Sequence, residues 1–311
     1  MWLILAFTSA ALLGLYDVCK KHALRGNVVL TVLWLNTLFC SLLFLPSIVL
    51  SATSHIAENT LLYVPATTWM EQRLIMLKAV IVLSSWICGY YGMKWLPLTI
   101  VGPINATRPV MVLVGAMLVF GERLNIYQWI GVTFAIVSFF LLSRSGKKEG
   151  IDFRHNRWIV LVVLAAMLGA VSGLYDKYLM APTTEGGAGI NRMAVQSYYN
   201  IYQLVLMTIA VTLMRWHQKA TTSASQPATA FHWTWSIPLI SLFLSIADFA
   251  YFYALSLSGA MISVVSMIRR GSVVVSFFVG AMVFNERNLW AKVIDLALVL
   301  LGMLFLYLGS A

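Results

Sequence analysis

The chain has 311 residues, of which 60% are hydrophobic and only 10% charged, and its mean hydropathy is +0.85. This composition excludes an ordinary water-soluble globular protein and predicts an integral membrane protein. The formal net charge of +10 would suggest a nucleic-acid partner for a soluble domain. Here the basic residues lie mostly at the ends of apolar segments, where they set membrane topology, so we expect no nucleic-acid partner.

Continuously apolar runs of about 20 residues follow one another along the chain, and each is long enough to cross a bilayer as a helix. The predicted spans are residues 2–22, 28–50, 73–92, 98–120, 125–143, 158–180, 194–216, 235–257, 260–284 and 289–309. The sequence therefore predicts an all-α polytopic membrane protein with ten transmembrane helices.

The two halves of the chain resemble each other. Gly-Leu-Tyr-Asp at 14–17 recurs at 173–176, and Val-Phe-Gly-Glu-Arg at 119–123 recurs as Val-Phe-Asn-Glu-Arg at 283–287. We predict a first five-helix repeat over residues 1–146, a basic linker over 147–157 and a second repeat over 158–311. Because five is odd, the second copy enters the membrane in the opposite orientation. Inverted repeats of this kind are typical of secondary transporters.

Lysine and arginine are unevenly distributed between the two predicted sides of the membrane. One side carries only Arg73, Lys78, Arg123 and Arg192, whereas the connections after odd-numbered helices carry most of the others. The positive-inside rule then predicts that the connection between the repeats is cytoplasmic and that both termini lie outside. We expect a multi-pass protein of the bacterial cytoplasmic (inner) membrane, with the lipid bilayer as its surroundings.

Three arginines fall near the middle of predicted spans: Arg108 in 98–120, and Arg269 with Arg270 in 260–284. A charge at that depth costs at least about 2.5 to 3.5 kcal/mol unless it meets protein, water or a ligand. Arginine forms bidentate hydrogen bonds with phosphate or carboxylate, so we hypothesise an anionic substrate. Since adjacent helical residues point about 100° apart, one of the two neighbours can bind substrate while the other pairs internally.

The alternative is a buried structural network in which the arginines pair with acidic residues inside the bundle. Asp17 has Lys20 and Lys21 at the spacing of same-face ion pairs, and Asp176 is followed by Lys177, so helix-end ion pairs are the simpler interpretation of these aspartates. Asp248 has no cation within four residues, and a carboxyl group at its depth is a candidate for proton coupling.

Other polar side chains complete the predicted substrate site. Asn105, Tyr91 and Tyr251 lie in or beside the same spans and are assigned to substrate binding, although such residues also commonly join helices. Neither the three cysteines nor the five histidines show metal-ligand spacing, so we predict no metal and no cofactor. The sequence shows no paired carboxylates, no nucleophile–histidine arrangement and no P-loop. We therefore predict neither an enzyme nor an ATP-driven pump.

Several short motifs occur together: Pro97-Leu98, Gly-Glu-Arg-Leu at 121–124, Gln128 with Gly131, residues 268–274 and Phe-Asn-Glu-Arg at 284–287. In combination they resemble the EamA family of the drug/metabolite transporter (DMT) superfamily over nearly the whole chain. The resemblance implies a carrier of small polar metabolites or drugs that works by alternating access. The plastid sugar-phosphate translocators of that superfamily are similar in using basic residues on the corresponding two helices to hold phosphate. Members generally have cytoplasmic termini, opposite to the charge count here.

The sequence thus favours a secondary carrier of a small-molecule substrate, most simply a phosphate- or carboxylate-bearing one. Two alternatives stay open: a proton-coupled exporter of amino acids or drugs in which the arginines are purely structural, and a lipid-phosphate-handling membrane subunit. Ten helices can enclose a cavity alone, so we expect a monomer or a homodimer.

Overall fold

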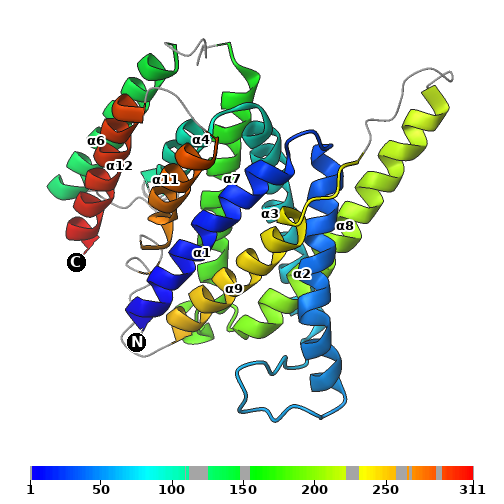
Figure 1. The fold of residues 1–311 in the computed structure, drawn as a ribbon. Coiled ribbons are helices and arrows are strands. Elements are labelled where there is room, and N and C mark those ends of the chain that lie inside the picture. The colour runs from blue at the N-terminus through cyan, green and yellow to red at the C-terminus, as the bar shows by residue number, and fades with distance from the viewer. Residues whose placement is uncertain are drawn as a thin grey trace.

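The fold is that of a computed structural model, which describes residues 2–108, 110–111, 125–147, 155–221, 231–256, 265, 268–284 and 289–310. The described part is helical and contains no strand (Figure 1). The second half of the predicted span 98–120, most of the 147–157 linker, the start of the predicted span 260–284 and the Glu-Arg motifs lie outside the described residues.

The first half of the chain contributes α1 (Trp2–Ala23), α2 (Val29–Ala52), α3 (Trp69–Trp95), α4 (Leu98–Ala106) and α6 (Ile126–Lys147). The second half contributes α7 (Arg157–Met180), a 3-10 turn η1 (Thr183–Glu185), α8 (Arg192–Thr221), α9 (Ser236–Ser256), α11 (Ser272–Phe284) and α12 (Leu289–Ser310). Within the described residues these helices match the predicted spans to within a few residues, except at the two arginine-bearing segments.

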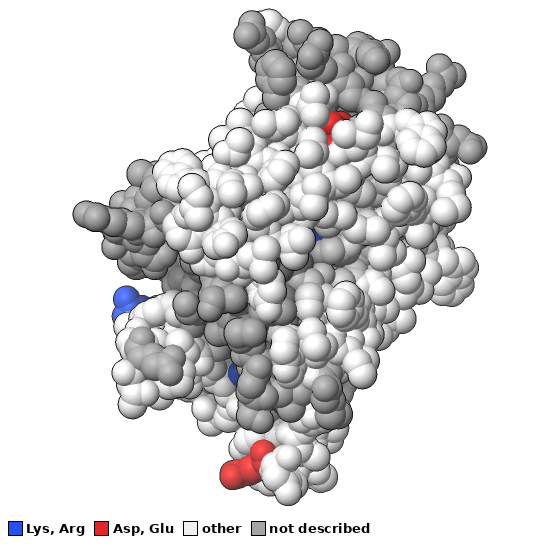
Figure 2. All heavy atoms as spheres, turned by 90° about the vertical axis from the view of Figure 1, so that its left-hand side faces the viewer, with Lys and Arg blue, Asp and Glu red and all other residues white. Residues whose placement is uncertain are grey.

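Five of the helices are long and apolar enough to cross a membrane: α1, α2, α3, α7 and α9. Figure 2 shows a face of the molecule on which nearly all described side chains are uncharged. Large apolar side chains such as Ile4, Phe7 and Met282 are more than half exposed. An apolar exterior of this extent matches lipid better than water. A helical protein with five candidate membrane helices is thus observed, whereas the predicted ten-span inverted repeat extends beyond the described residues.

The helices of the two halves pack mainly against each other rather than within their own half. α1 contacts α9 and α11, α3 contacts α7 and α8, α2 contacts α8 and α9, α4 contacts α11 and α7, and α6 contacts α12. In Figure 1 the blue α1 and the yellow α9 accordingly lie side by side. Close packing between α1 and α11 depends on Gly14, where a Cβ atom would lie 2.8 Å from the Ser272 carbonyl oxygen.

Both predicted spans that carry the arginines are interrupted beside the arginine. α4 ends at Ala106, and Thr107 forms a turn in which its amide donates to the Ile104 carbonyl at 3.2 Å. Gly271 likewise forms a turn, donating to the Ile268 carbonyl at 2.9 Å, before α11 begins. A Cβ atom at Gly271 would lie 2.8 Å from that carbonyl oxygen, so the turn requires glycine. The prediction of one continuous helix was therefore wrong at both arginine-bearing segments.

Candidate functional site

Arg108 follows the break at the end of α4 and points toward α7. Its Nη2 donates to the Asn105 side-chain oxygen at 3.1 Å, so Asn105 positions the guanidinium rather than standing free. The guanidinium lies against Gly169 of α7, where a Cβ atom would come 2.7 Å from the Arg108 Cζ. The buried Nε of Arg108 has no hydrogen-bond partner among the described residues. Asn105 therefore accepts one hydrogen bond from this guanidinium, whereas its Nε donor has no partner among the described residues.

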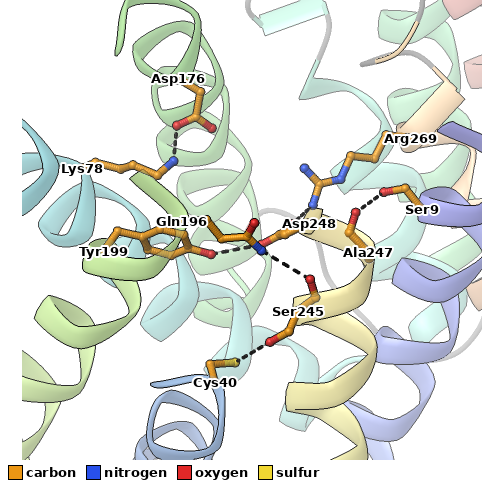
Figure 3. A network of polar contacts seen from close by, with 10 residues as sticks. All are labelled: Ser9, Cys40, Lys78, Asp176, Gln196, Tyr199, Ser245, Ala247, Asp248 and Arg269. Carbon is orange, nitrogen blue, oxygen red and sulfur yellow. Dashed lines mark hydrogen bonds and ion pairs between the residues drawn. The ribbon is translucent and has the colours of Figure 1, made fainter. Parts of the chain in front are cut away.

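Arg269 forms an ion pair with Asp248 of α9 (Figure 3). The side chains of both are mostly buried, at 17% and 10% exposure. The hydroxyl of Tyr199 on α8 donates to the other carboxylate oxygen of Asp248 at 3.0 Å, and the Arg269 guanidinium lies 4.2 Å from the centre of the Tyr251 ring. Arg269 is thus paired internally, and Tyr251 contacts this arginine as part of the same cluster.

Arg270 differs from its neighbour. Its side chain is half-buried, and the described residues provide it with no hydrogen bond and no ion pair. It lies close enough to Arg108 and Arg269 for mutual electrostatic repulsion. Three guanidinium groups from two interrupted segments therefore converge, and Asp248 is the acidic side chain that pairs with one of them.

The first of the two repeated aspartates, Asp17, lies at the end of α1. It pairs with Lys20 at 2.7 Å, and the Lys20 ammonium lies 4.2 Å from the Tyr16 ring centre and 5.1 Å from that of Tyr90. Lys21 instead donates to the carbonyl oxygens of residues 93 and 96 at 2.6 Å each. Lys21 therefore ties α1 to the carboxyl end of α3, whose last carbonyls lack helical partners.

The second aspartate has a partner that sequence reasoning missed. Asp176 pairs with Lys78 of α3 rather than with Lys177, whose side chain lies outside the described part of the structure. From the sequence, Lys78 counts among the basic residues at one side of the membrane, yet its side chain is only 3% exposed. The available signal was a lysine inside an apolar helix with no acidic residue three or four positions away, which requires a partner from elsewhere.

Polar side chains on α8 extend the cluster away from the arginines. Gln196 donates to the Ser245 carbonyl at 3.3 Å, and Asn200 donates to the Gln196 carbonyl at 2.8 Å. Both are at most 2% exposed, and their amide oxygens have no partner among the described residues. Tyr91 of α3, by contrast, packs against the hydrophobic core, and no described contact joins it to the arginines. The structure therefore does not bring Tyr91 into the cluster.

A comparison with known protein families identifies the first half of the chain. The model of the EamA-like transporter family matches residues 1–144. This half of the chain belongs to the EamA-like transporter family. The match covers the first predicted repeat and includes Asn105 and Arg108. EamA-like proteins are membrane transporters of the DMT type, which agrees with the apolar helices and gives no indication of an enzyme.

Solved structures extend the likeness to the whole chain. One crystal structure of a protein has a TM-score of 0.57 with this chain at 14% sequence identity, and the alignment covers 99% of this chain and 97% of the other. At that identity the likeness concerns the fold alone, and it extends over both halves of this chain. No curated protein matches the sequence.

Proposed function

We propose that this protein is a secondary carrier that moves small phosphate- or carboxylate-bearing metabolites across a cell membrane by alternating access. The observation that carries the proposal is Arg270, a half-buried guanidinium that forms no ion pair with a described residue. Asp17, the described carboxylate with an electrostatic effect on Arg270, is already paired with Lys20. Arg108 beside it has an unused donor, while Arg269 is already paired with Asp248. A visiting anion would satisfy the groups that the protein leaves unpaired.

The balance of charges in the arginine cluster supports a negatively charged substrate. Three guanidinium groups converge, Asp248 pairs with Arg269, and Asp17, which is within electrostatic reach of Arg108 and Arg270, is already paired with Lys20. Among these described groups the cations therefore outnumber the carboxylates. Desolvated cations that remain unpaired at membrane depth cost several kcal/mol, so a permanent surplus would destabilise the bundle. A phosphate or carboxylate that enters, binds Arg270 and Arg108 and leaves again would relieve that cost for part of each cycle.

The packing pattern supports alternating access through an inverted repeat. If α1, α2, α3, α4 and α6 correspond to α7, α8, α9, α11 and α12, most contacts between the halves have a counterpart. The contact of α1 with α9 corresponds to that of α7 with α3, and α2 with α9 to α8 with α3. The contact of α1 with α11 corresponds to that of α7 with α4, and the pairs α2 with α8, α4 with α11 and α6 with α12 correspond to themselves. Two halves related in this way can rock about a midplane site.

Counterflow in proteoliposomes against a panel of phosphorylated and carboxylated metabolites tests the proposal. We expect Arg270→Gln to abolish counterflow of the best substrate while the purified protein keeps its melting temperature. Arg192→Gln is the matched control, because Arg192 at the start of α8 lies 4.9 Å from the Tyr253 ring centre, on a different element from the arginine cluster. Unchanged counterflow by Arg270→Gln would exclude the anion site. Stabilisation by anionic lipid vesicles alone would favour a lipid-phosphate-handling subunit.

A proton-coupled exporter is the second candidate, and the Asp248–Arg269 pair favours it because one arginine already has a structural partner. In that case separation of the Asp248–Arg269 pair is the conformational step that is coupled to proton movement. Counterflow driven by an imposed proton gradient separates the two functions. The exporter requires a gradient response that Asp248→Asn abolishes, whereas a simple anion exchanger shows no gradient response.

A further inference from the structure

The ion pair between Lys78 and Asp176 joins the two halves of the chain away from the arginine cluster. Lys78 lies on α3 in the first half and Asp176 on α7 in the second, with side-chain exposures of 3% and 14%. Burying two charges is costly, and their mutual attraction offsets that cost only in part, so such a pair contributes little net stability. Its position between the halves therefore calls for a role other than stability.

Helices α8 and α9 also meet at the ammonium group of Lys78. It lies 5.0 Å from the ring centre of Tyr199 on α8 and 5.9 Å from that of Phe252 on α9. Tyr199 is the residue whose hydroxyl donates to Asp248, the partner of Arg269. Figure 3 shows Lys78 and Asp176 on one side of the Tyr199 ring, with Asp248 and Arg269 beyond its hydroxyl. A single side chain thus contacts both ion pairs.

The equivalent aspartate of the first half gives the comparison. Asp17 occupies the same place in its Gly-Leu-Tyr-Asp motif as Asp176, but its partner Lys20 belongs to its own helix. Lys20 lies over Tyr90 of α3, which is about 18 Å along that helix from Lys78 at 1.5 Å per residue. The two aspartates therefore lie toward opposite ends of α3, and of these two ion pairs the Asp176 pair is the one that bridges the halves.

We propose that the Lys78–Asp176 pair is the gate that closes one side of the bundle, and that Tyr199 couples this gate to the Asp248–Arg269 pair. The inference rests on the proposed carrier function and specifies how one side is sealed. An anion that binds Arg270 and Arg108 also attracts the adjacent Arg269. When Arg269 moves toward the anion, its pair with Asp248 breaks, and the carboxylate that holds the Tyr199 hydroxyl is released. Tyr199 then moves, Lys78 loses its ring contact, and the pair between the halves separates.

A thiol introduced behind the gate can report its state without any substrate. Ser172 lies one turn before Asp176 on α7 and three residues after Gly169, which contacts Arg108, and it is 8% exposed. The reporter protein carries Ser172→Cys, has its three native cysteines replaced by alanine, and is treated with a membrane-impermeant thiol reagent. A second reporter, Leu61→Cys, marks the side from which the gate is approached, since Leu61 is 45% exposed in the loop that precedes α3. We call the two introduced groups the gate thiol (position 172) and the loop thiol (position 61).

We expect the gate thiol to be protected in the otherwise native protein and to react at least tenfold faster in Lys78→Met, from the side on which the loop thiol reacts. Lys78→Met with Asp176→Asn removes both charges, so it gives the same result without leaving a buried charge unpaired. Exchange of the two residues, Lys78→Asp with Asp176→Lys, restores protection. Asp17→Asn is the matched control in the other repeat and leaves the gate thiol protected from this side.

Thiol labelling tests the gate and counterflow tests the anion site, so either proposal can be overturned without the other. If the gate thiol stays protected in the single and the double variants while the loop thiol reacts normally, Lys78–Asp176 is not a gate, whatever the protein transports. If Arg270→Gln leaves counterflow intact while Lys78→Met exposes the gate thiol, the gate is supported and the anion site is not. Equal reactivity of the gate thiol in the native background and in all variants would also overturn the gate.

Discussion

Asp248 and Arg269, separated by 21 positions in the sequence, form an ion pair between α9 and the helical turn before Gly271. This pair distinguishes two adjacent arginines. Arg269 turns to a carboxylate of the protein, and Arg270, about 100° further around the turn, does not. The internal pair satisfies the charge of Arg269, and the neighbouring guanidinium of Arg270 is the group that we assign to the proposed anion.

Replacing Asp248 by asparagine leaves Arg269 without its charged partner. We expect the free energy of unfolding to fall by about 3 to 5 kcal/mol, the typical cost of breaking a buried pair by removing one member. Thermal unfolding in detergent measures this effect, and inorganic phosphate stabilises Asp248→Asn more than the native protein because Arg269 becomes available to it. Asp248→Asn with Arg269→Gln recovers most of the loss. A single variant as stable as the native protein would contradict the role given to this pair.

A methyl group at Gly169 displaces Arg108 from its place against α7. The added Cβ would lie 2.7 Å from both Cζ and Nη1 of the guanidinium, so this flexible side chain must move. We expect Gly169→Ala to raise the KM of the transported anion about tenfold, or ~1.4 kcal/mol in binding, with little change in melting temperature. Gly173→Ala is the control on the same helix, where a Cβ meets nothing within 4 Å. Equal KM values for both variants would show that Arg108 does not contact the substrate.

The helices and the central arginines could be predicted from the sequence because apolar length and intramembrane charge are local signals. The breaks beside Arg108 and Arg270 were not predicted, since Thr107 and Gly271 interrupt runs that remain apolar throughout. Pro103 inside α4 and the glycine at 271 were the available signals, and neither alone separates a kink from a full interruption.

Ion-pair partners that lie on different helices were the second feature that could not be predicted from the sequence. Asp176 and Lys177 are adjacent in sequence, but adjacent residues of a helix do not face each other. The actual partner, Lys78, lies 98 positions away, on a helix that meets Asp176 only when the two halves dock. For Asp17, where a lysine stands three positions on in the same helix, the spacing identified the observed partner Lys20.

The α3–α7 contact depends on a glycine at the crossing. A Cβ atom at Gly92 would overlap the Val162 side chain and lie 3.3 Å from the Trp158 carbonyl oxygen. We expect Gly92→Ala to force the helices apart and lower stability by about 1 to 3 kcal/mol, the usual range for overpacking. Gly89→Ala, one turn earlier, meets only Ala165 at an ordinary 3.6 Å and is the matched control. Thermal unfolding that falls equally for both variants would indicate a helix effect rather than the crossing.

Tyr199→Phe separates the two contacts of this side chain. The ring that lies over Lys78 is kept, whereas the hydroxyl that donates to Asp248 is lost. We expect the gate thiol to react faster than in the native background even in the absence of substrate, because no hydroxyl contact with Asp248 holds the ring against Lys78. The best counterflow substrate, which is expected to speed labelling of the gate thiol in the native background, should have little effect in Tyr199→Phe. We expect Tyr199→Phe to transport this substrate more slowly but still to bind it, as measured by thermal stabilisation. A substrate response equal to that of the native background would show that the site and the gate communicate by another route.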